Sequence, residues 1–256
     1  MLQIAHILPN NCINENMPRQ EFEMYLTHKI LEDPDRFKFL SQDRAKMIKS
    51  YKILDNSACE LGEGLDFDKV LQAADIIGAS EIVLPDIPRS GLSFTKTLQY
   101  ASELTDEVKE KYRIAAVAQG ETEEQILACA EQILSLSCVS TIMIPKWYCS
   151  LNSSNGLGRH SLTKKIFTLI QAFGSDVDIH WLGLDTGARE LISPLANVVR
   201  SVDTGYFAAL STPQWSHLHA LSERPRELKI NLESMDVDME RWNNLRHKLQ
   251  KTIEEV

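Results

Sequence analysis

KILDNSACELGEG, residues 52–64, is an apolar run that ends abruptly in a carboxylate, followed by small polar residues and two glycines. Strands buried on both faces of a parallel sheet have near-continuous apolar sequences, and functional groups lie just past their carboxyl ends. Asp55 occupies such a position. The segment therefore predicts a buried parallel strand that delivers a carboxylate to a pocket.

Strand-like and helix-like segments alternate along the 256 residues. Between the strand-like runs, apolar residues recur at helical spacing, as at Phe67, Val70, Ala74 and Ile77, where Gly78 follows as a stop signal. Such alternation builds βαβ units and a parallel sheet. Seven strand candidates lie at residues 4–8, 52–55, 81–86, 113–118, 139–144, 178–183 and 197–202, and an eighth lies either at 228–232 or hidden in the N-terminal third.

This strand count favours a (β/α)8 barrel over a doubly wound sheet. We predict an α/β protein with one barrel domain over residues 1–256 that carries a C-terminal helix at about 237–254. Residues 20–50 are charged and amphipathic, and they predict two helices separated at Asp33-Pro34-Asp35, because proline cannot continue a helix. One helix is predicted at about 95–108 and a short one at 188–196.

Composition excludes several classes of protein. No apolar run approaches the roughly 20 residues that cross a bilayer, and the start MLQIAHILPNNC lacks the features of a secretory signal, so we expect a cytoplasmic protein. The five cysteines are widely spread, which indicates reduced thiols. No zinc-binding, Walker A or Gly-x-Gly-x-x-Gly pattern occurs, and we therefore predict neither a metal site nor a cofactor.

The formal net charge of −9 argues against a surface coated with phosphate-binding residues. Two local basic groups remain, and each is either a solvated face or a binding site. The first comprises Lys146, Arg159, His160, Lys164 and Lys165, and the second comprises Arg224, Arg226 and Lys229.

Five predicted strands end in side chains suited to acid/base work or to binding a heteroaromatic ligand: Asp55, Asp86, Gln119, Lys146 and Asp203. An aspartate after a strand is often only a helix cap or a turn former. In a barrel, however, these strand ends converge on one mouth. Two carboxylates in one pocket permit glycosidic chemistry, and Asp with Gln can read the edge of a purine-like base.

The ordered set of motifs resembles the tRNA-guanine transglycosylase superfamily. Leu54-Asp55-Asn56-Ser57 is similar to its Asp-Ser-Gly-Gly segment, and Leu84-Pro85-Asp86 falls where the family has a base-recognising aspartate. Val117-Ala118-Gln119-Gly120 resembles its Val-Gln-Gly, and His180-Trp181-Leu182-Gly183 resembles its His-Tyr-Leu-x-Gly strand. Ser201-Val202-Asp203 falls where the nucleophilic aspartate is expected.

Within this superfamily the chain looks most like the short viral branch of DNA 7-deazaguanine transglycosylases (DpdA-type). The resemblance implies that Asp203 attacks C1′ of a guanine nucleotide and that Asp55 is the general acid and base. The partners it implies are guanine in DNA and a free 7-deazaguanine base such as preQ0. The acidic net charge makes a helper protein or a second copy of the chain a candidate additional partner. The implied substrate-binding residues are Asp86, Gln119, Asn56, Ser57, Lys146, Gly183 and His180.

Several positions depart from the family pattern. Ala58 and Cys59 replace the two glycines after the first aspartate, and residues 143–146 replace a Gly-Gly-Leu strand that helps to hold the base. No cysteine follows Cys149, so the zinc-binding subdomain of the tRNA enzymes is absent, which favours DNA over tRNA.

Alternative functions are a tRNA-guanine transglycosylase or nucleoside hydrolase with the same pocket, and a catalytically silent barrel that binds nucleic acid or a partner. His6 and His180 lie in apolar strands, where a hydrogen-bonded core role is expected. Tyr206, Phe207 and Trp147 are either walls of a base pocket or plain core residues.

Overall fold

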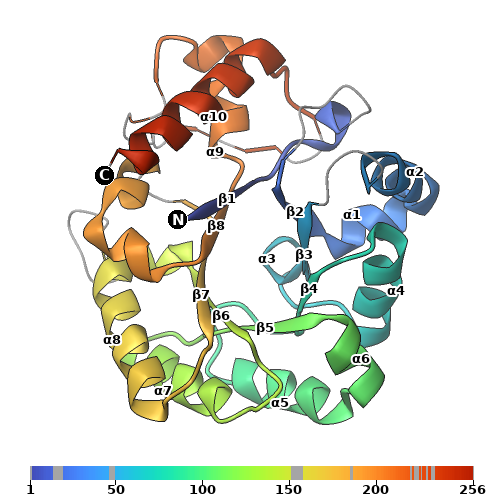
Figure 1. Ribbon diagram of the computed structural model, residues 1–256, viewed down its shortest axis with the longest axis vertical. Coiled ribbons are helices and arrows are strands. Elements are labelled where there is room, and N and C mark those ends of the chain that lie inside the picture. Colours follow the sequence, from blue (N-terminus) through green and yellow to red (C-terminus); the bar gives the residue numbers. More distant parts are fainter. Residues whose placement is uncertain are drawn as a thin grey trace.

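Eight parallel strands form one nearly closed barrel, with helices around its outside (Figure 1). The computed structural model describes residues 2–13, 20–45, 50–150, 158–184, 187–219, 221, 225, 227–228, 230–231 and 234–255. The strands pair in the order β1-β8-β7-β6-β5-β4-β3-β2, which confirms the predicted (β/α)8 architecture. They are β1 (Gln3–His6), β2 (Phe22–Leu26), β3 (Tyr51–Asp55), β4 (Glu81–Val83), β5 (Arg113–Val117), β6 (Thr141–Pro145), β7 (Asp178–Leu182) and β8 (Ser201–Thr204).

The eighth strand, β2, lies in the N-terminal third, inside the segment that the charge pattern predicted as helical. Phe22, Met24 and Leu26 alternate with Glu23 and Tyr25, and this period of two directs one set of side chains to the barrel interior. The two predicted helices follow it as α1 (Thr27–Glu32) and α2 (Pro34–Ala45), and they are separated at Asp33 as expected. At 228–232 the described residues do not form a strand.

The remaining helices differ from the predictions mainly at their ends. The single helix expected at 95–108 is two helices, because the Thr105 side chain accepts a hydrogen bond from the Val108 N–H and caps a new start. The α-helices are α3 (Ala58–Leu61), α4 (Phe67–Ile77), α5 (Ser93–Glu103), α6 (Asp106–Lys111), α7 (Glu123–Leu134), α8 (Gly158–Phe173), α9 (Tyr206–Leu210) and α10 (Met239–Glu254). The 3-10 helices are η1 (Asn10–Cys12), η2 (Lys146–Ser150), η3 (Gly187–Ile192), η4 (Pro194–Val198) and η5 (Pro213–Trp215).

The strand predicted at 197–202 begins later than expected. Ser193 caps η4 and Pro194 starts it, so residues 194–198 are helical and β8 covers Ser201–Thr204. Asp203 is consequently inside a strand rather than beyond its end.

Side chains from alternate strand positions divide the core into two layers. The barrel interior holds Ala5, Phe22, Met24, Ile53, Val83, Ala115, Val117 and Met143. The intervening residues pack outward against the helices in a larger apolar layer. Asp55 and Gln119 continue the inward register two residues after Ile53 and Val117, so the fold directs them to the barrel mouth.

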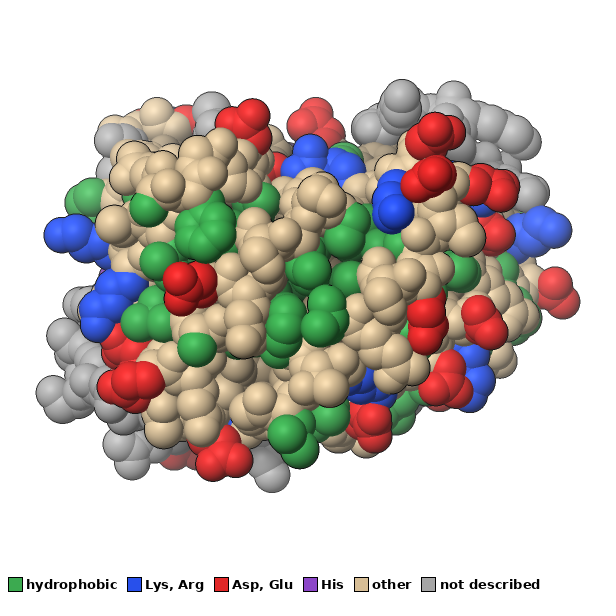
Figure 2. Space-filling model, turned by 90° about the horizontal axis from the view of Figure 1, so that it is seen from below, with side chains coloured by type: hydrophobic (Ala, Val, Ile, Leu, Met, Phe, Trp, Pro, Cys, Tyr) green, Lys and Arg blue, Asp and Glu red, His purple; other side chains and the backbone are tan. Residues whose placement is uncertain are grey.

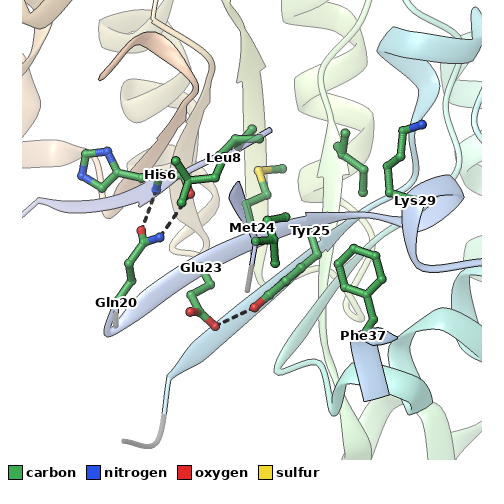
Figure 3. A pocket seen from close by; sticks show the side chains of 11 residues that line it. His6, Leu8, Gln20, Glu23, Met24, Tyr25, Lys29 and Phe37 are labelled. Atoms are coloured by element: carbon green, nitrogen blue, oxygen red, sulfur yellow. Dashed lines mark hydrogen bonds between the residues drawn. The ribbon is translucent and has the colours of Figure 1, made fainter. Parts of the chain in front are cut away.

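β1 and β2 flank the seam of the barrel, and the Gln20 side chain bridges it. Gln20 Oε1 accepts a hydrogen bond from the His6 N–H (3.1 Å), and Gln20 Nε2 donates to the His6 carbonyl (3.4 Å), as Figure 3 shows. The amide therefore supplies the pair of hydrogen bonds that a neighbouring strand would make. A cavity of about 30 Å³ lies beside it, which is room for a water molecule rather than for a nucleobase.

A polar layer closes the barrel at the amino ends of the strands. Arg200 binds Glu81 (2.7 Å) and Asp178 (3.4 Å), and Arg113 also binds Asp178 (2.7 Å). The Tyr51 hydroxyl donates to Glu81 (2.8 Å). Positive and negative groups are thus paired at this end, where a barrel gains stability rather than activity.

Candidate active site

The predicted site residues all lie at or near the carboxyl ends of the strands. Asp55 ends β3, Lys146 directly follows β6, and Gly183 directly follows β7. Asp86 and Gln119 come within three residues of the ends of β4 and β5. The barrel therefore gathers residues that are up to about 150 positions apart in the sequence on one face. The others are Asn56 and Ser57 after β3, Asp203 in β8, and His180 within β7.

Two N–H groups orient the Asp203 carboxylate. Its Oδ1 accepts hydrogen bonds from His180 Nε2 (3.1 Å) and from the Gly183 backbone N–H (2.9 Å). Asp203 is buried, with 6% of its surface exposed, and no hydrogen bond from the described residues reaches Oδ2. One carboxylate oxygen is thus fixed by two donors, whereas the other is not.

A chain of donors determines the tautomer of His180. Arg200 Nε donates to Ser201 Oγ (3.2 Å), and Ser201 Oγ lies 2.8 Å from His180 Nδ1. The Asp203 carboxylate only accepts, which places a ring proton on Nε2 and makes His180 its donor. Nδ1 then accepts the proton of the Ser201 hydroxyl, whose oxygen accepts from Arg200. His180 is thus a hydrogen-bonded buried residue, as expected, and it also orients the Asp203 carboxylate.

The turn that carries the Gly183 N–H is held by an ion pair that the sequence analysis missed. Arg159 donates to the carbonyls of Leu182 (2.9 Å) and Gly183 (2.8 Å), and it pairs with Glu190 (2.9 Å). Both charged side chains are fully buried. Arg159 therefore does not belong to a solvated basic face, and residues 224, 226 and 229 of the second predicted basic group lie outside the described residues.

Gly183 has a left-handed backbone conformation (φ +66°), and a Cβ there would lie 2.8 Å from Lys146 Cδ. An alanine would meet both penalties, because L-residues rarely adopt this conformation and the Lys146 stem fills the space. Glycine at position 183 thus lets the backbone N–H reach Asp203 and leaves room for the Lys146 side chain.

Asp55 is half-buried and is held by the loop after β3. The Ser57 N–H donates to Asp55 Oδ2 (3.3 Å), and Ser57 has a positive φ of 65° that is unusual for a residue with a side chain. Ser57 Oγ accepts from the His28 N–H (3.1 Å), and Thr27 donates to the Asp55 carbonyl (2.6 Å). The start of α1 therefore fixes this loop.

The pKa of Asp55 is raised well above its usual value. Burial is the largest cause, followed by the negative charges of Glu60, Asp86 and Asp203. The pKa of Glu60 is raised as well. Burial and the charge of Asp203 raise it, and the positive charge of Lys146 offsets part of this effect. Asp55 consequently stays protonated to a higher pH than an ordinary aspartate.

Glu60 was not predicted as a site residue. Its only sequence signal was its position in the same loop, five residues after Asp55. Its charge raises the pKa of Asp55 from the short helix α3, which carries it.

Asp86 is buried between two side-chain amides. Asn56 Nδ2 donates to its Oδ1 (2.8 Å) and Gln119 Nε2 to its Oδ2 (2.7 Å). Burial nevertheless raises the pKa of Asp86 to about 6, although these two donors act in the opposite direction. The Gly64 N–H binds the Asp86 carbonyl (2.8 Å), and a Cβ on Gly64 would lie 2.9 Å from Asp86 N. The glycine that ends the 52–64 segment thus allows this close approach.

The predicted aromatic walls divide between the mouth and the core. Trp147 is half-buried, and its Nε1 donates to Gln119 Oε1 (3.4 Å). Tyr206 and Phe207 are fully buried in the outer apolar layer, where the Phe207 ring lies 5.1 Å from His6. They are core residues, and only Trp147 lies beside the site.

Within the described part of the chain, no group of three or more His, Cys, Asp or Glu side chains is placed to hold a metal ion. No helix there is long and apolar enough to span a membrane.

The residues at the mouth supply three kinds of group. Asp203 is an oriented carboxylate, Asp55 is a carboxyl group with a raised pKa, and Asp86 pairs with side-chain amides.

Comparisons with known proteins identify the fold but no family. No protein-family model matches the sequence, and no curated protein matches it. The solved structures include a similar barrel, the crystal structure of a HpcH/Hpal aldolase/citrate lyase family protein from Burkholderia cenocepacia J2315. The TM-score is 0.51 at 9% sequence identity, over 79% of this chain and 87% of that one. At this identity the likeness concerns the barrel alone.

Proposed function

We propose that the chain is a base-exchange glycosyltransferase that replaces guanine in DNA with a free 7-deazaguanine such as preQ0. One observation carries the proposal. An oriented carboxylate, Asp203, and a carboxyl group with a raised pKa, Asp55, interact electrostatically at one barrel mouth. Two carboxyl groups in different environments suit one to act as nucleophile and the other as acid.

In the proposed reaction, Asp203 Oδ2 attacks C1′ of the target nucleotide and the bond from C1′ to the base nitrogen breaks. The base takes the electron pair of that bond and a proton from Asp55, and it leaves as neutral guanine. The incoming 7-deazaguanine gives its ring N–H proton to the Asp55 carboxylate and attacks C1′. The bond to Asp203 then breaks, and both carboxyl groups return to their starting states.

The edge of the base would be read by Asp86 and Gln119. Each Asp86 oxygen uses one lone pair on an amide and retains another, and Gln119 Nε2 has a second N–H beyond the one it gives to Asp86. Guanine presents N–H donors beside the O6 acceptor, which complements a carboxylate next to an amide N–H. Adenine presents an N–H₂ donor in place of O6 and would meet the Gln119 donor unfavourably.

DNA is preferred to tRNA because the sequence has no cysteine after Cys149 and therefore lacks the zinc ligands of the tRNA enzymes that it resembles. A target base inside a duplex must be taken out of the stack before a barrel mouth can receive it. Trp147 is the aromatic side chain at the mouth that could receive its face.

Mass spectrometry of nucleosides tests the proposal. Duplex DNA would be incubated with protein and preQ0 and then digested, and we expect the 7-deazaguanine nucleoside to replace deoxyguanosine. Asp55→Asn should abolish the product, whereas Asp106→Asn, at a side chain that is 94% exposed, should not change it. Exchange of labelled guanine into tRNA but not into DNA would select the tRNA enzyme instead, and release of free guanine without exchange would select a hydrolase.

A further inference from the structure

Arg89 and Trp147 form a stacked pair beside the proposed base-reading residues. Arg89 lies in the loop between β4 and α5, and Trp147 lies on η2 after β6. The Arg89 guanidinium carbon is 5.4 Å from the centre of the Trp147 ring. Both loops follow carboxyl ends of strands, so the pair belongs to the same face as the carboxylates.

The pair is tied to Gln119 by two hydrogen bonds. The Arg89 backbone N–H and Trp147 Nε1 both donate to Gln119 Oε1, at 3.1 and 3.4 Å. Because Oε1 accepts both, Nε2 is directed to Asp86. The Arg89 backbone is therefore fixed against the amide that would read the base, and its guanidinium lies over the neighbouring Trp147 ring.

The backbone at Arg89 is in the left-handed region, with φ +56°. In the described part of the chain, only Ser57 shares this conformation among residues other than glycine, and Ser57 supports Asp55. Such a conformation is unfavourable for a residue with a side chain and persists where the surroundings enforce it, commonly at functional sites. Here it allows the Arg89 N–H to reach Gln119.

The Arg89 guanidinium is exposed and has no carboxylate partner among the described residues, although the chain has 36 Asp and Glu residues. Arg113, Arg159 and Arg200 all pair with carboxylates. On the described atoms of the face in Figure 2, basic side chains are scattered among acidic ones and form no continuous basic patch. Because the formal net charge is −9, binding of nucleic acid would depend on local cations close to the site.

We propose that Arg89, stacked on Trp147, is a phosphate-binding residue that holds the phosphodiester backbone next to the extruded nucleotide. The inference rests on the proposed function and adds the contact that would secure the substrate. A guanidinium that stacks on an aromatic face keeps its N–H edge available, and its planar fork fits two phosphate oxygens. Trp147 pre-organises that fork, because it limits the conformations of a long side chain.

The salt dependence of DNA binding tests the phosphate contact. Binding of a short guanine-containing duplex would be measured across KCl concentrations in an Asp203→Asn background, so that no covalent adduct contributes. We expect Arg89→Ala to make the slope of log K against log[KCl] shallower by about 0.9, the contribution of one phosphate on duplex DNA. Arg89→Lys should retain the slope but bind more weakly, because an ammonium lacks the fork.

Two controls separate the contact from general effects of charge and folding. Lys109→Ala removes an exposed cation on α6, close to the amino end of β5, and should leave the slope unchanged. Arg89→Gly removes the charge at a φ that glycine adopts without strain, and it should fold as well as the parent and show the shallower slope.

Three outcomes would overturn the inference: an unchanged slope in Arg89→Ala and Arg89→Gly, an equal change in Lys109→Ala, or no binding of the duplex by the Asp203→Asn parent. Because the assay requires no chemistry, it can succeed while base exchange fails. It can also fail while the exchange assay succeeds.

Discussion

The two ends of the barrel differ in how their charged side chains are paired. At the amino ends of the strands, Arg200 and Arg113 meet Glu81 and Asp178 in direct ion pairs. At the carboxyl ends, burial raises the pKa values of Asp55, Glu60 and Asp86; the charges of Glu60, Asp86 and Asp203 raise that of Asp55 further, and the charge of Asp203 raises that of Glu60. One end neutralises its charges and stabilises the fold, whereas the other retains carboxyl groups that favour protonation and are therefore suited to proton transfer.

The largest effect is expected at the carboxyl end. Asp55→Asn keeps an oxygen for the Ser57 N–H but removes the acid, so base exchange should fall by about 10²- to 10⁴-fold. The free energy of unfolding at pH 8 should not fall, because the variant removes a group whose charged form is disfavoured in the folded state. Kinetic assays and urea titrations would measure both effects. A loss of activity accompanied by a large loss of stability would contradict the distinction between the ends.

At the amino end the expected pattern is reversed. Arg200→Met leaves Glu81, which is fully buried, without its cation and should lower the free energy of unfolding by about 3–5 kcal/mol. The matched control is Arg113→Met, which breaks a pair whose side chains are 42% and 37% exposed and should cost at most about 1 kcal/mol. Chemical denaturation of both variants would measure the contrast. Equal losses would show that burial of the pair is not what matters.

The pH dependence of stability distinguishes the ends further. The folded-state pKa of Asp86 is about 6, above its ordinary value, so the folded protein holds this proton while the unfolded chain has lost it. This contribution to stability is present below pH 4 and is lost as the pH rises through 6. Relative to Asp86→Asn, the wild type should therefore lose about 2–3 kcal/mol between pH 4 and pH 7. Parallel stability curves for the two proteins would contradict the raised pKa, and Asp106→Asn serves as the exposed control.

The smallest effect is expected at Ser201, whose hydroxyl connects Arg200 at the amino ends of the strands with His180. Ser201→Ala removes the donor to His180 Nδ1 and should cost about 1 kcal/mol of stability. It should also allow the ring proton to move from Nε2 to Nδ1, which would lower the rate of exchange with little change in KM. Nitrogen-15 NMR of the ring reports the tautomer directly. A wild-type ring protonated on Nδ1 would refute the donor chain.

The strand ends were predictable from the sequence because near-continuous apolar runs are typical of strands buried in a parallel sheet, and the carboxyl ends of such strands lie on one face. Asp55, Asp86 and Gln119 could be assigned to one face for this reason. An eighth strand in the N-terminal third was one of two alternatives, but its residues were not identified, because Glu23 and the charged residues after it hid a five-residue alternation next to two helices. Short strands beside amphipathic helices give a weak periodic signal.

The contacts that shift pKa values and orient side chains at the site were harder to predict from the sequence. Glu60 affects Asp55 only through the turn at α3, and Arg159 resembles a surface cation until Glu190, 31 residues later, pairs with it in the core. Tyr206 and Phe207 come two and three residues after β8, yet they lie on α9 and pack in the outer helical layer. Each of these features depends on three-dimensional placement that residue spacing alone does not specify.

Trapping of the covalent intermediate tests the central proposal most directly. Wild-type protein incubated with guanine-containing DNA, denatured and examined by intact-mass and peptide mass spectrometry should carry a DNA adduct on Asp203. Asp203→Asn should carry none, although it retains an oxygen that can accept from His180 and Gly183. An adduct that persists in Asp203→Asn, or that maps to another residue, would contradict the assignment of Asp203 as the nucleophile.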